Sequence, residues 1–159
     1  MEQLSLSKWL KRIIIGIAVC GLIVYAYIVP SYGQSLVESY PEFANRYYPW
    51  LFFIWMTGIP CYTALFLGWR IAAGIGQDKS FTMENAKYLK WISVLAAGDA
   101  LLVFVGNLVF LLLDLSHPGI MLLSLLIVFA GVAISVAAAA LSHLVRKAAA
   151  LQEQSDLTI

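Results

Sequence analysis

The chain has 159 residues, of which 62% are hydrophobic and 12% are charged, and its formal net charge is +1. Soluble domains average about 25% charged residues, and a soluble fold of this length cannot bury so much apolar surface. The composition therefore excludes an ordinary soluble domain and indicates a protein that lipid solvates in part.

Four long apolar segments make up most of the chain. A hydrocarbon core about 30 Å thick needs about 20 apolar helical residues to cross it, with about 17 as the lower limit, and every segment reaches that range. Helices are expected because each satisfies its own backbone hydrogen bonds, and no segment has the period-two alternation of a membrane barrel. We predict one all-α membrane domain over residues 1–159, an integral membrane four-helix bundle with spans at 13–29, 50–69, 91–113 and 120–145.

Basic residues are concentrated on one side of the predicted bundle. Arg46 alone lies between the first and second spans, and no Lys or Arg lies between the third and fourth. The other nine are Lys8, Lys11, Arg12, Arg70, Lys79, Lys87, Lys90, Arg146 and Lys147. Because cytoplasmic loops carry the excess of Lys and Arg, we predict that both termini and the loop 70–90 are cytoplasmic.

The two external connections differ in length. Residues 30–49 form a long, tyrosine-rich segment, for which we expect a short interfacial helix over 35–48 that Pro41 starts or interrupts. Residues 114–119 are few and end in His-Pro-Gly, which predicts a tight turn and an antiparallel hairpin of the third and fourth helices.

The cytoplasmic loop has helix-ending and helix-starting signals. Gly74 and Gly76 are expected to end the second helix beyond the membrane surface. Thr82 is a good N-cap, and Glu84 is favourable in the first turn of the helix that follows. That third helix is expected to run from Met83 to the outer turn, and the fourth to about Gln152, so both should extend into the cytoplasm.

Asp99 is the only formally charged residue inside the four apolar segments. A carboxylate about 12 Å deep costs several kcal/mol unless it is protonated or hydrogen-bonded, so it should face the bundle interior. Tyr62, at a comparable depth on the second helix, is the candidate hydrogen-bond donor. The functional interpretation is a proton or cation site or a conformational switch, and the structural one is an interhelical hydrogen bond that fixes packing. The lack of a second intramembrane charge favours packing.

Two further features of the spans favour helix contacts. Asn107 is expected to hydrogen-bond to a neighbouring helix. Gly131, Ser135 and Ala139 recur at four-residue spacing, which lets two helix backbones approach closely. This pattern serves packing within the bundle and self-association equally well, so it is compatible with a monomer and with a homo-oligomer.

Groups for catalysis or metal binding are not arranged together in the sequence. His117 and His143 fall on opposite sides of the membrane, and Cys20 and Cys61 have no His or carboxylate spaced to complete a ligand set. The sequence has no phosphate loop, zinc-protease motif or nucleophile–base pair. We therefore expect no metal site, no cofactor and no enzymatic activity.

Residues 76–85, Gly-Gln-Asp-Lys-Ser-Phe-Thr-Met-Glu-Asn, are followed by Leu89 at the foot of a span. In this loop, in its length and in its helix count, the chain resembles the YoaS-like family of bacterial four-helix membrane proteins, domain of unknown function 2975. Ser80 stands where the family commonly has Pro. The resemblance implies a multi-pass protein of the bacterial inner (cytoplasmic) membrane without an established activity. Because such proteins are often encoded beside small helix-turn-helix regulators, it also implies a membrane sensor or anchor for a regulator.

These observations leave three hypotheses for function. The first is a regulatory membrane protein that binds a cytoplasmic partner through residues 70–90 and does not itself bind nucleic acid. Independently of it, Phe81 can pack under the bundle while Thr82, Glu84 and Asn85 cap a helix, and this structural role is favoured over direct contact of these residues with a partner. The second is a small oligomeric transporter or channel subunit that uses Asp99. The third is a structural protein that packs lipids or other membrane proteins. The single buried charge favours the first and third.

Overall fold

The computed structural model describes residues 3–116 and 118–157, and all regular structure within them is helical. The elements are α1 (Gln3–Ile23), the π-helical segment η1 (Val24–Ile28), α2 (Val29–Ser39), the 3₁₀ turn η2 (Pro41–Phe43), α3 (Ala44–Gly76), α4 (Met83–Leu112) and α5 (Pro118–Asp156). They form four rods: α1, η1 and α2 together make the first, and α3, α4 and α5 make the others. Each rod is long and apolar enough to cross a membrane. The all-α class and the prediction of four transmembrane helices are confirmed.

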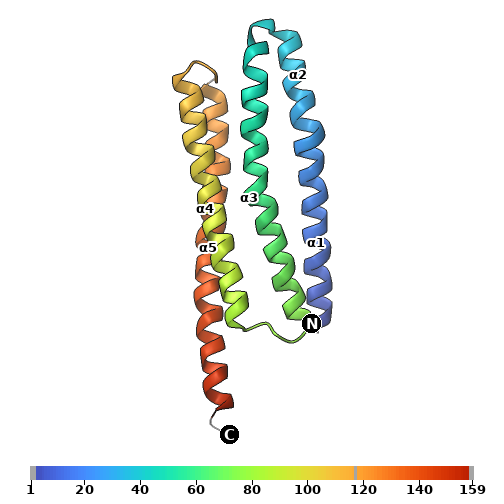
Figure 1. Cartoon of the computed structure of the whole chain (residues 1–159), viewed down its shortest axis with the longest axis vertical. Helices are drawn as coiled ribbons and strands as arrows, with labels where there is room; N and C mark the ends of the chain where they lie inside the picture. Colours follow the sequence, from blue (N-terminus) through green and yellow to red (C-terminus); the bar gives the residue numbers. More distant parts are fainter. Residues whose placement is uncertain (1–2, 117, 158–159) are drawn as a thin grey trace.

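The four rods form an open row in the order α1, α3, α4 and α5; the first three are separate in Figure 1, where α5 overlaps α4. Helix packing joins α1 to α3, α3 to α4 and α4 to α5, and within the described residues α5 packs against α4 alone. The sequence predicts a bundle, and the structure shows that this bundle is not closed. Lipid solvates apolar helix faces as well as another helix does, so no hydrophobic force brings α1 and α5 together.

Both described ends of the chain and the connection 77–82 lie at the same end of the row, which we call the inner end (Figure 1). This is the arrangement that the Lys and Arg distribution requires, because it gathers the basic flanks on one side. The turn between α2 and α3 and the turn between α4 and α5 lie at the opposite end. The predicted hairpin of the third and fourth helices is α4–α5; His117, in its turn, lies outside the described residues.

The first external segment differs from the prediction. In place of a long segment with a short interfacial helix, the first rod continues through Pro30 to Ser39, and only Tyr40–Phe43 connect it to α3. The π-helical turn explains how Pro30 is tolerated. In this turn an N–H bonds to the carbonyl five residues earlier, as Val29 N–H does to Val24. Pro30 has no N–H, so the carbonyl five residues before it, that of Tyr25, lacks this partner. The indole of Trp55 on α3 donates to this oxygen at 3.0 Å.

The inner end of α3 falls at Gly76 as predicted, but for a different reason. The residue in the left-handed conformation is Asp78, with φ 61°, and Lys79 N–H bonds to the carbonyl of Gly74 at 3.0 Å. The two glycines instead allow side chains of neighbouring segments to approach the backbone of α3 closely. A Cβ on Gly76 would lie 2.7 Å from the Ser7 hydroxyl oxygen, and one on Gly74 would lie 3.3 Å from the Asn85 side-chain amide.

Two predicted helix extensions are also present. Thr82 is the N-cap of α4, and its hydroxyl accepts the N–H of Asn85 at 3.2 Å. The fourth helix passes the predicted end near Gln152 and reaches Asp156. α5 thereby extends beyond the inner ends of the other three rods (Figure 1).

Candidate functional site

Asp99 on α4 faces α3, where its hydrogen-bond partner is Cys61. The Cys61 thiol donates to Asp99 Oδ2 at 3.4 Å. The other carboxylate oxygen, Oδ1, is buried and has no hydrogen-bond partner among the described residues. A thiol is a weak donor, so the protein satisfies this carboxyl group only in part.

Two hydroxyl groups extend this polar group from α4 to the first rod. The hydroxyl oxygens of Tyr25, in η1, and Thr57, on α3, are 3.1 Å apart. Because Thr57 donates its proton to the Ile54 carbonyl at 2.7 Å, Tyr25 is the donor of this pair. Thr57 and Cys61 lie one turn apart on the same face of α3, and Cys61 bonds to Asp99. Thr57, Tyr25, Cys61 and Asp99 therefore form a polar cluster that joins three of the four rods.

Tyr62 and Asn107 do not take part in this cluster, and the contacts predicted for them are wrong. The Tyr62 hydroxyl donates to the carbonyl of Ala18 on α1 at 2.7 Å, so it bonds away from Asp99. The Asn107 side-chain nitrogen donates to the Val103 carbonyl of its own helix at 2.8 Å instead of bonding to a neighbouring helix. The donor to Asp99 is therefore Cys61.

The loop between α3 and α4 is held in place by Asn85. This residue is 4% exposed, and its side-chain nitrogen donates to the carbonyls of Lys79 at 2.8 Å and Ser80 at 3.1 Å. Glu84 accepts the hydroxyl of Tyr88 one turn later, and its carboxylate lies 3.9 Å from Arg70. The predicted capping role of Thr82 is thus joined by a loop-binding role of Asn85.

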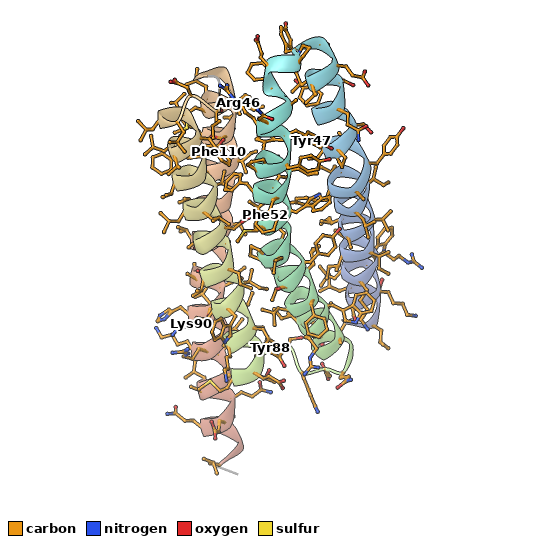
Figure 2. All side chains as sticks on the ribbon, turned by 45° about the horizontal axis from the view of Figure 1, so that its top comes forward. Arg46, Tyr47, Phe52, Tyr88, Lys90 and Phe110 are labelled. Atoms are coloured by element: carbon orange, nitrogen blue, oxygen red, sulfur yellow. The ribbon has the colours of Figure 1, made fainter. Side chains whose placement is uncertain are left out.

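Hydrogen bonds also fix neighbouring rods to each other near this end. The Ser7 hydroxyl donates to the Ala72 carbonyl at 2.6 Å, and the Ser142 hydroxyl donates to the Ala86 carbonyl at 2.6 Å. These bonds tie α1 to α3 and α5 to α4. Figure 2 shows Tyr88 and Lys90 on the same part of α4. The inner end is therefore a well-connected platform and not a set of independent helix ends.

Phe81 departs from its predicted position under the bundle. Its side chain is 56% exposed, because the loop that Asn85 holds turns it outward. It lines an open groove of about 560 Å³ between the loop and the end of α5. The lining residues are Gln3, Asp78, Lys79, Ser80, Phe81, Thr82, Met83, Ala149, Gln152, Glu153 and Leu157. We call this the inner groove.

Four spanning helices, an intramembrane polar cluster and a helix-capped loop define a multi-pass membrane protein. The model of the family described as "Protein of unknown function (DUF2975)" matches residues 31–159, and the chain belongs to this family. It is 30% identical over 149 residues to the "Uncharacterized membrane protein YoaS" of Bacillus subtilis, with 92% of each chain covered. No solved structure matches the chain. The resemblance seen in the sequence is confirmed.

Proposed function

We propose that this protein is a bacterial inner-membrane anchor or sensor that binds a cytoplasmic regulator at the end formed by the loop 77–82, the start of α4 and the end of α5. In this proposal both termini are cytoplasmic, as the Lys and Arg distribution favours. The partner implied by the family resemblance is a small helix-turn-helix regulator. The membrane protein itself contacts no nucleic acid and has no enzymatic activity.

The observation that supports the proposal most is apolar surface far from lipid. Met83 lies about 12 Å along α4 from Trp91, where the third span begins, and Asp156 about 16 Å along α5 from Val145, where the fourth ends. The headgroup layer is only about 5–8 Å thick on each side. Yet Phe81 is 56% and Met83 53% exposed. Exposed apolar patches outside the membrane are typical of protein-binding surfaces.

The hydrogen-bonded structure of this end also supports the binding of a partner. Asn85 holds the loop, and the serine bonds join adjacent rods, so the surface exists before a partner arrives. A preformed surface binds without the entropic cost of ordering a flexible segment. The transport alternative gains less support, since the hydrogen-bond partner of Asp99 within the described residues is the Cys61 thiol and not a second charged group.

Site-specific photocrosslinking in native membranes tests this proposal. A photoreactive phenylalanine analogue at Phe81 is expected to crosslink to a soluble cytoplasmic protein. The same analogue at Tyr48, which is 75% exposed at the opposite end, is the matched control and should give no such product. Crosslinking from Phe81 to lipid alone, or to no soluble protein, would contradict the proposal.

A further inference from the structure

The inner groove combines apolar and acidic groups. Phe81, Met83 and Leu157 supply apolar surface, and Leu157 is 82% exposed. Asp78 and Glu153 supply carboxylates from the loop and from α5. The groove therefore has two chemically distinct components, and a partner must match both.

The two carboxylates are available for a partner. Within residues 3–116 and 118–157 neither Asp78 nor Glu153 has an ion-pair partner, whereas the nearby Glu84 lies 3.9 Å from Arg70. Among the described lining residues, Lys79 is the one basic residue and Asp78 and Glu153 are the two acidic ones, so acidic groups outnumber basic ones in the groove.

Charge is also separated along the membrane normal. On α5, Arg146 and Lys147 come directly after the span, and Glu153 lies about two turns further from the membrane. On α4, Lys87 and Lys90 lie between the span and Met83. The basic residues are thus placed to meet anionic lipid headgroups, and the acidic residues of the groove are placed to meet a soluble partner.

We infer that the inner groove binds a basic amphipathic helix of a cytoplasmic protein, with apolar side chains against Phe81, Met83 and Leu157 and cationic side chains beside Asp78 and Glu153. This inference rests on the proposed function and adds the chemistry of the partner. The groove has one wall from the end of α5 and one from the loop and the start of α4. Its volume of about 560 Å³ suits a few anchoring side chains, which is how helices occupy apolar grooves.

Binding of a designed peptide tests the inference. The full-length protein is placed in nanodiscs of neutral phosphatidylcholine, so that the lysines of the peptide are not attracted to anionic lipid, and empty nanodiscs measure any adsorption of its apolar face. The probe is a fluorescent helical peptide with leucines at i, i+3, i+4 and i+7 and lysines on either side, and its anisotropy is followed. It should bind, more weakly as salt increases, and a peptide with glutamates in place of the lysines should bind several-fold more weakly.

The double variant Asp78→Asn, Glu153→Gln removes the acidic component with little change in shape. Asparagine tolerates the left-handed conformation of residue 78, and glutamine is as good a helix former as glutamate. The variant should bind the basic peptide about fivefold more weakly. Glu38→Gln, Glu42→Gln makes the same charge change at the opposite end and should leave binding unchanged.

Three outcomes would overturn the inference. They are equal binding of the basic and acidic peptides, equal weakening by both double variants, and occupation of the groove by a second copy of the chain. The photocrosslinking experiment separates these outcomes from failure of the proposed function. If Phe81 crosslinks to a soluble protein while the peptide result is negative, the anchor or sensor function stands and only the basic helix is wrong.

Discussion

Replacing Gly131 by leucine is expected to separate α5 from α4 near the middle of the membrane. A Cβ on Gly131 would lie 3.0 Å from the Cβ of Ala100 and 3.5 Å from the carbonyl oxygen of Ala96, and a backbone atom cannot rotate away. Overpacking of this kind costs about 1–3 kcal/mol. Because α5 packs against α4 alone among the described helices, no other contact compensates.

The measurement is disulfide formation between Ser93→Cys on α4 and Ser135→Cys on α5, in a background without Cys20 and Cys61. The two hydroxyl oxygens are 3.2 Å apart, so the cysteines should crosslink readily in the parent and slowly in the Gly131→Leu variant. The matched control is Gly98→Leu, since a Cβ on Gly98 meets no described atom within 4 Å. Equal crosslinking in both leucine variants would show that the α4–α5 contact is looser than described.

Replacing Asn85 by alanine is expected to release the loop between α3 and α4. The substitution removes both donors that hold the Lys79 and Ser80 carbonyls and leaves those oxygens without that partner. Loss of two such bonds at a residue that is 4% exposed should lower the free energy of local opening by about 2–3 kcal/mol. α4 itself should persist, because the Thr82 cap is independent of the Asn85 side chain.

Limited trypsin digestion measures this effect at Lys79, inside the loop. If cleavage follows local opening, it should be about 30-fold faster or more in the Asn85→Ala variant. Asn45→Ala, an exposed asparagine in the first turn of α3, is the matched control and should leave the rate unchanged. An unchanged rate in Asn85→Ala would mean that other contacts hold the loop.

Local and compositional features of the fold were predictable from the sequence, and the arrangement of the rods was not. The spans follow from segment length and composition, and the start of α4 follows from Thr82, a local hydrogen-bonding signal. The open row does not follow, because residues that face lipid and residues that face another helix are equally apolar. The continuation of the first rod through Pro30 depends on a π-helical turn and on Trp55, thirty residues away from Tyr25.

The candidate sites show the same division. The sequence identified Asp99 from its charge but paired it with Tyr62, the neighbour of its actual partner. One residue changes the direction of a helical side chain by about 100°, so depth alone cannot distinguish Cys61 from Tyr62. The exposure of Phe81 likewise depends on the Asn85 bonds to the loop, which only the three-dimensional structure shows.

The side of the membrane that the inner groove faces is the central claim, because a cytoplasmic partner requires it. Single cysteines at Ser80 and at Glu42, in the background without Cys20 and Cys61, are treated with a membrane-impermeant maleimide in intact cells. The cysteine replacing Ser80 should react only after the cells are broken, and the one replacing Glu42 should react in intact cells. The reverse labelling pattern would place the groove outside the cell and contradict the proposed function.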